Sequence, residues 1–143
     1  MAERTRIMGI DPGEARIGIA LSDPLRLVAS ALETIRWNGV DRTKADDRIA
    51  RIVEEYGVAE IVIGLPRRTD GRAGPAEEKS RALAAEYAER FGIPVHLQDE
   101  RYTSVLAGRI LTETGTRKDR RGGAVDRIAA GILLQDYLEH RRK

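Results

Sequence analysis

Three acidic residues occupy positions from which they could act together on one ligand. Asp11 closes a short apolar run, Glu100 closely follows another, and Asp126 falls in the first turns of a C-terminal helical pattern. Ligands of open α/β sheets gather beyond the strand ends, so Asp11 and Glu100 are expected to share one edge of a sheet. Oxygen ligands select hard cations, and the sequence therefore predicts a site for Mg²⁺ or Mn²⁺.

A carboxylate cluster of this kind would support metal-dependent cleavage of phosphodiesters. Like charges repel, so the cluster is stable in ionised form only with a cation. Two such ions about 3.5–4 Å apart can activate a water and stabilise the leaving oxygen. Taken alone, Asp126 is better explained as a cap or dipole partner at the start of its helix, and its role as a ligand depends on the three acids together. It shares a helix face with Ala129, Ala130 and Leu133, however, and an unpaired acid beside such a packing face is costly.

Basic residues are unevenly distributed along the chain. Residues 1–100 carry 15 basic and 18 acidic side chains, whereas residues 101–143 carry 10 basic and 5 acidic ones. Arginine and lysine bind phosphates without reading bases, so this distribution suggests a polyanion-facing surface, although a solvated basic tail explains the charge equally well. The candidate nucleic-acid contacts are Arg67, Arg68, Arg72, Arg101, Arg117, Lys118, Arg120 and Arg121.

Other chemically interesting side chains have structural interpretations. His96 lies inside an apolar strand pattern, which favours a structural role over a catalytic one. Trp37 and Tyr102 could stack on bases, although packing is the favoured role for both. Aromatic residues make up only 4% of the chain, which argues against a stacking platform for single strands.

The elements that must position these residues follow from apolar periodicity and turn residues. The first three predicted strands are joined by short turns and should pair antiparallel, whereas helices separate the later strands and imply parallel crossovers. Asp41 is the expected N-cap of the first helix, which ends at Gly57. The predicted strands span 7–11, 16–21, 25–34, 59–64 and 94–98, and the other predicted helices span 75–91, 103–114 and 123–139. The predicted fold class is α/β, with one mixed sheet covered by helices, in one domain over residues 1–143.

Composition excludes several classes of protein. The 143 residues are 41% hydrophobic and 34% charged, which is typical of a globular chain. The absence of cysteine excludes a disulfide scaffold, a thiolate zinc site and a catalytic cysteine. Only two histidines are present, which leaves little room for a zinc centre built on histidine. No apolar run approaches the ~20 residues of a membrane span, and no signal peptide is evident. We therefore expect a soluble cytoplasmic protein without a membrane partner.

Four ordered motifs together resemble the YqgF family, also called RuvX. They are Gly9 to Asp23 with its Asp-Pro-Gly turn, Val62 to Pro66 with the following Asp70-Gly71, Asp99 to Ser104, and Asp126 to Gln135. Members of that family are described as nucleases of the 16S rRNA precursor and, earlier, as Holliday-junction resolvases. The match covers nearly the whole chain.

The resemblance implies an RNase H-like fold and divalent-metal phosphodiester hydrolysis in a bacterial cytoplasm. Asp11, Glu100 and Asp126 match the acids of the family. The implied substrate is the 5′ end of the 16S rRNA precursor, free or in a pre-ribosomal particle. Arg67 and Arg68 depart from the family, which usually has an apolar residue and an asparagine there. This departure is expected to strengthen phosphate binding at the expense of selectivity.

Two alternatives remain open from the sequence. The first is a resolvase of branched DNA, which needs two active sites and hence a homodimer, whereas the rRNA nuclease can be a monomer. The second is a ribosome-assembly factor that binds nucleic acid without catalysis.

Overall fold

The computed structural model describes residues 4–66, 74–99 and 122–141. Its strands are β1 (Arg6–Asp11), β2 (Arg16–Ser22), β3 (Ala29–Arg36), β4 (Val58–Leu65) and β5 (Val95–Asp99), and its helices are α1 (Thr43–Tyr56), α2 (Pro75–Phe91) and α4 (Gly122–Arg141). The predicted helix over 103–114 lies outside the described residues.

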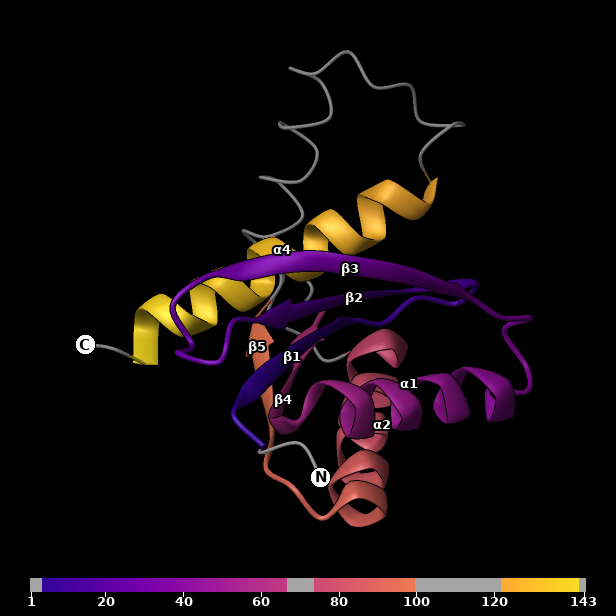
Figure 1. The fold of residues 1–143 in the computed structure, drawn as a ribbon. Coiled ribbons are helices and arrows are strands. Elements are labelled where there is room, and N and C mark those ends of the chain that lie inside the picture. Colours follow the sequence, from indigo (N-terminus) through magenta and orange to yellow (C-terminus); the bar gives the residue numbers. More distant parts are fainter. Residues whose placement is uncertain (1–3, 67–73, 100–121, 142–143) are drawn as a thin grey trace.

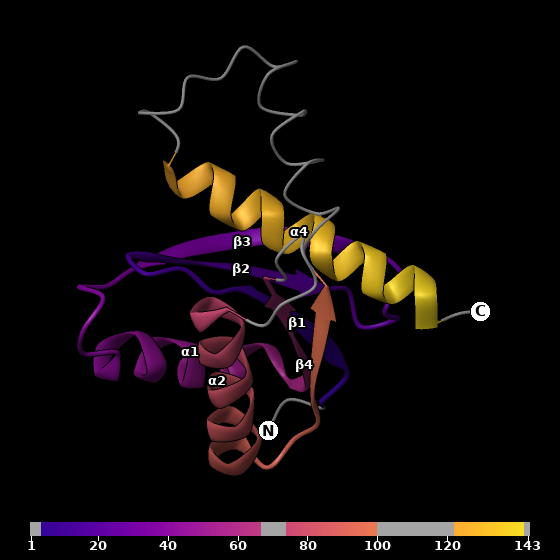
Figure 2. The ribbon, with the colours of Figure 1, turned by 180° about the vertical axis from the view of Figure 1, so that it is seen from behind.

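The strands form one mixed sheet in the order β3-β2-β1-β4-β5. β1 pairs antiparallel with β2, and β2 pairs antiparallel with β3. β4 runs parallel to both β1 and β5. Figures 1 and 2 show α4 lying across one face of this sheet and α1 and α2 on the opposite face. The predicted mixed sheet covered by helices is therefore confirmed.

Each face of the sheet has its own apolar core because side chains alternate along a strand. On β1, Met8 and Ile10 belong to the larger core, which includes the buried apolar residues of α1 and α2. Ile7 belongs to the smaller core, which α4 closes with Ala130 and Leu134. This alternation places Asp11 on the α4 face of the sheet, two residues beyond Gly9.

Two predicted boundaries are wrong for local reasons. β3 begins at Ala29 instead of residue 25, because Asp23 Oδ1 accepts the backbone N–H groups of Leu27 (2.7 Å) and Val28 (2.8 Å) and closes a turn there. Helix α1 has Arg42 as its N-cap. Asp41 nevertheless accepts the backbone N–H of Thr43 at 3.0 Å, so the predicted acid lies one residue before the cap and still binds the first turn.

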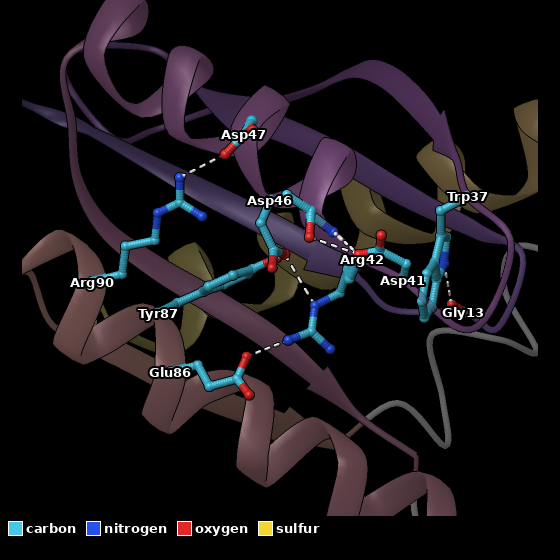
Figure 3. Close-up of polar contacts among 10 residues, drawn as sticks. Gly13, Trp37, Asp41, Arg42, Asp46, Asp47, Glu86, Tyr87 and Arg90 are labelled. Carbon is cyan, nitrogen blue, oxygen red and sulfur yellow. Dashed lines mark hydrogen bonds and ion pairs between the residues drawn. The ribbon is translucent and has the colours of Figure 1, made fainter.

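A polar network joins α1 to α2 on the face opposite α4 (Figure 3). The hydroxyl of Tyr87 donates to Asp46 Oδ1, and Arg42 binds both Asp46 (3.0 Å) and Glu86. Burial and the hydrogen bond to Asp46 raise the pKa of Tyr87, so its hydroxyl keeps its proton as a donor. Arg90 binds Asp47 at 3.0 Å. The network fixes the two helices to each other on this face of the sheet.

The turn at Asp23 gives a test of stability against pH. Its hydrogen bonds from Val28 and Leu27 lower the pKa of Asp23. A lowered pKa stabilises the folded state above the ordinary Asp value of about 3.9, and that contribution is lost as the pH falls through the folded pKa. Asp23→Asn, which keeps an acceptor but loses the charge, should therefore melt at a lower temperature than wild type at pH 7.

The difference in melting temperature should close between about pH 4 and pH 2. Glu89→Gln, at an exposed position of α2, is the control and should follow the wild-type profile. A constant difference down to pH 2 would contradict the role of the Asp23 charge.

Candidate active site

Asp11 ends β1 at the point where the sheet meets the start of α4. Its cross-strand partner on β2 is Gly18, and the next partner, on β3, is Thr34. By alternation these three residues form one row across the α4 face of the sheet. β1 is a central strand flanked by β2 and β4, which gives the Asp11 carboxylate a rigid support.

Asp126 lies over this row because the backbone of α4 packs directly on the backbone of β2 at Gly18. A Cβ atom added to Gly18 would lie 2.0 Å from the carbonyl oxygen of Asp126. One turn further along α4, a Cβ added to Gly9 would lie 2.9 Å from Leu134 Cβ and 3.1 Å from the Ala130 carbonyl. The missing side chains of the two glycines let α4 contact the sheet. Since Gly18 pairs with Asp11, the two acids that the sequence singles out are brought together.

The electrostatics of Asp126 agree with this placement. Its side chain is 22% exposed, and desolvation is the largest cause of its raised pKa. Arg16 opposes the rise, Asp11 adds to it, and Arg36 opposes it. Asp11 and Asp126 are therefore close enough to repel each other, and two arginines offset part of that repulsion.

Arg16 is a site residue that sequence reasoning missed. Its Nε lies 3.1 Å from Asp126 Oδ2, yet that buried oxygen accepts no hydrogen bond within the described part of the chain. A signal was available, because Arg16 lies two residues before Gly18 in a strand and so shares its face. Ion pairing without a hydrogen bond leaves Asp126 Oδ2 able to accept a further positive ligand.

These residues fit a divalent cation, although they do not complete its ligand set. Asp11 and Asp126 repel each other, and one oxygen of Asp126 is buried without a hydrogen bond among the described residues. Carboxylate oxygens are the ligands that Mg²⁺ and Mn²⁺ prefer. Among residues 4–66, 74–99 and 122–141, no group of three or more potential metal-ligating side chains is present. Glu100, the third predicted ligand, lies outside the described residues.

Glu100 stays a prediction, but the strand register places its described neighbour, Asp99. In the register of the parallel strands Ile10 pairs with Ile63, Gly64 with Gln98, and Leu65 with Asp99. The carboxyl ends of β1, β4 and β5 therefore reach the same edge of the sheet. Asp99 ends β5, and Glu100 is the next residue in the chain.

Several other predicted residues can now be placed. Trp37 donates from Nε1 to the carbonyl of Gly13 at 2.9 Å (Figure 3) and packs against the larger core. It therefore has the packing role that the sequence favours over base stacking. His96 contacts Glu60 at 3.0 Å and stacks on Tyr137, which agrees with a structural role. Tyr102 and all eight predicted basic contacts lie outside the described residues: Arg67, Arg68, Arg72, Arg101, Arg117, Lys118, Arg120 and Arg121.

The Trp37 contact supports the turn that follows Asp11. The backbone N–H of Trp37 also donates to the carbonyl of Ala15 at 3.0 Å. Trp37, which follows β3, thus donates two hydrogen bonds to the β1–β2 turn, one to Gly13 and one to Ala15. These bonds fix the backbone immediately after Asp11.

The architecture is an RNase H-like fold. Among solved structures it is similar to "T. thermophilus RuvC in complex with Holliday junction substrate", with a TM-score of 0.58 and 14% identity over 97% of this chain and 96% of that one. It is also similar to the fowlpox virus resolvase in complex with Holliday junction DNA, with a TM-score of 0.56 and 14% identity over 96% of this chain and 99% of that one. Identities this low establish the fold alone.

Sequence comparison is more specific. The family model described as "RuvX: Holliday junction resolvase" matches residues 5–140, and the chain belongs to that family. A protein of Moorella thermoacetica described as "Putative pre-16S rRNA nuclease" is 45% identical over 94% of both chains. A protein of Streptococcus gordonii with the same description is 42% identical over 94% of this chain and 97% of its own. None of the described helices combines the length and the apolar character that a membrane span requires.

Proposed function

We propose that this chain is a divalent-metal-dependent nuclease that processes the 5′ end of the 16S rRNA precursor. The observation that carries the proposal is the placement of Asp126 over Gly18, the cross-strand partner of Asp11, at the end of a central strand. Family membership and the descriptions of two relatives as pre-16S rRNA nucleases support the choice of substrate.

Asp11 and Asp126, with Glu100 as the expected third ligand, would hold the cation. When bound, Mg²⁺ or Mn²⁺ lowers the pKa of a water and stabilises the charge that develops on the phosphate oxygens. The chain contributes a rigid strand end for Asp11 and a helix backbone seated on the sheet for Asp126. Arg16 offsets part of the negative charge at 3.1 Å from Asp126. No side chain has to act as the nucleophile.

The proposal places the protein in the bacterial cytoplasm, where the rRNA precursor is made. The substrate would be the precursor alone or within a pre-ribosomal particle. The eight basic residues predicted from the sequence would then contact its phosphates. One RNase H-like domain over residues 1–143 would carry both binding and cleavage.

The proposal is tested with two labelled substrates, a 16S precursor 5′-leader RNA and a four-way DNA junction. Each is incubated with the protein in Mg²⁺, Mn²⁺ or EDTA, and the products are mapped to the nucleotide. Cutting of the RNA alone, present with either ion and absent in EDTA, is the expected result. RNA that is bound but never cut, with every ion tried, would overturn the nuclease and favour the non-catalytic assembly factor.

A junction resolvase is the second candidate, favoured by the description of the family and by the fold shared with RuvC. Symmetric resolution needs two active sites, so this candidate requires a homodimer. Paired symmetric nicks in the junction, together with a dimer mass in solution, would establish it in place of the rRNA nuclease.

A further inference from the structure

We infer that Arg36 and Arg127, together with Arg16, form a binding surface for the nucleic-acid backbone beside the acid pair. We call these three residues the arginine row. The inference rests on the proposed function and names a surface that carries the phosphates next to the one being cut. It uses residues of β2, β3 and α4, none of which is among the basic residues predicted from the sequence.

The sheet register places the row. Arg16 on β2 pairs with Arg36 on β3. This pair lies two residues along each strand from Gly18 and Thr34, which are in the same row as Asp11. Both arginines therefore share the α4 face of the sheet with the acids. Adjacent strands lie about 4.8 Å apart, so the row extends about 10 Å from the strand of Asp11 to the free edge of the sheet at β3.

Side-chain contacts bring the third arginine to the same place. Arg127 follows Asp126 on α4, and its Nη1 donates to Thr34 Oγ1 at 3.4 Å. Arg16 lies 3.1 Å from Asp126, and the charge of Arg36 also acts on Asp126. Arg16, Arg36 and Arg127 thus come from three different elements that meet beside the acid pair.

Two of the three arginines in this row have no carboxylate partner among the described residues, whereas Arg16 is paired with Asp126. Within the described part of the chain, neither Arg36 nor Arg127 has a carboxylate within ion-pair distance. Most other described arginines differ. On the opposite face, Arg48 binds Glu33 of β3 at 2.6 Å, and on the helices behind the sheet Arg90 binds Asp47 at 3.0 Å. Arg36 is exposed and Arg127 half-buried, so both remain open to an anion from solution.

This pattern matches the charge of a phosphodiester chain. One phosphate at the acid pair would meet the metal, while its neighbours along the strand would meet guanidinium groups. A small anionic substrate would not need positive charge spread over about 10 Å. The geometry therefore points to a polynucleotide whose backbone runs from the acid pair past the ends of β2 and β3, beside the start of α4, toward the edge of the sheet.

Salt dependence of RNA binding is the readout that separates this surface from catalysis. The probe is a fluorescein-labelled single-stranded fragment of the 16S 5′ leader, bound in Mg²⁺ to protein carrying Asp11→Asn so that it is not cut. Arg36→Gln with Arg127→Gln removes two charges from the row. The control, Lys44→Gln with Arg51→Gln, removes two exposed charges from α1 on the opposite face of the sheet.

Binding weakens with salt, and the plot of log K against log salt has a negative slope. The glutamine variant of the arginine row should make this slope shallower by about 1.4, since each lost phosphate contact of a single strand contributes about 0.7. Its affinity near physiological salt should fall at least about tenfold, whereas the control pair should match the parent protein. Arg36→Lys with Arg127→Lys should restore the slope, because the contact depends on charge. Circular dichroism and melting temperature establish that each variant is folded.

Two results would overturn the inference. One is a slope in the glutamine variant equal to that of the control pair. The other is a lysine variant that binds as weakly as the glutamine variant. The salt dependence of binding does not depend on cleavage. The predicted change in slope can therefore be observed even if wild type cuts no RNA, and it can be absent even if wild type cuts. The two proposals are therefore tested separately.

Discussion

Asp11→Asn should reduce cleavage by about 10³-fold while binding of the RNA is retained. The substitution keeps the size and one oxygen of the side chain but removes the charge that would hold the cation. Loss of a single preorganised electrostatic group in an active site commonly costs 10²–10³-fold in rate. Asp11 also ends a central strand and lies at the surface of the core, so the change should leave the fold intact.

Single-turnover cleavage and fluorescence anisotropy measure the two effects independently. Asp126→Asn should behave in the same way, and Asp47→Asn, an exposed acid of α1 on the opposite face, should cut as wild type does. An Asp11→Asn protein that cuts at the wild-type rate would remove Asp11 from the active site.

Metal binding gives a check that does not depend on activity. A ligand that binds only the folded state raises the melting temperature in proportion to RT ln(1 + [L]/Kd). Mn²⁺ should therefore raise the melting temperature of wild type and of Asp47→Asn. It should have little effect on Asp11→Asn or Asp126→Asn, because each lacks a charged ligand. Equal shifts in all four proteins would mean that the ion binds elsewhere.

Gly18→Ala should cost about 3 kcal/mol of stability and most of the cleavage activity. The new Cβ would lie 2.0 Å from the Asp126 carbonyl oxygen and 2.3 Å from its carbon, both rigid backbone atoms. Helix α4 would have to move off the sheet, and overpacking of this kind typically costs 1–3 kcal/mol. Movement of α4 also carries Asp126 away from Asp11, so activity should fall along with stability.

Gly131→Ala is the matched control on the same helix. Its new Cβ would find Ala31 N as the nearest atom at 3.7 Å, which is an ordinary contact. Because alanine favours a helix interior over glycine by about 1 kcal/mol, this variant should be as stable as wild type or slightly more stable. Urea unfolding of both variants makes the comparison. A Gly18→Ala protein as stable as Gly131→Ala would contradict the close contact between α4 and β2.

Local pattern in the sequence determined much of this protein. The apolar runs predicted every described strand to within a few residues, and the lengths of the connections predicted which pairs are antiparallel and which are parallel. The spacing of Ala129, Ala130 and Leu133 after Asp126 predicted a packing face, and all three are buried. These features depend on short-range periodicity, which any stretch of chain displays by itself.

Only the tertiary structure decided how the acids and arginines are grouped. Asp11 and Asp126 are separated by 115 positions, and their proximity depends on strand register and on a helix seated on Gly18. The pairing of Arg16 with Arg36, and of Arg16 with Asp126, likewise depends on contacts between distant segments. Periodicity states which face of an element a residue occupies, but it carries no information about which face of another element lies opposite. That choice is made when the two cores close on either side of the sheet.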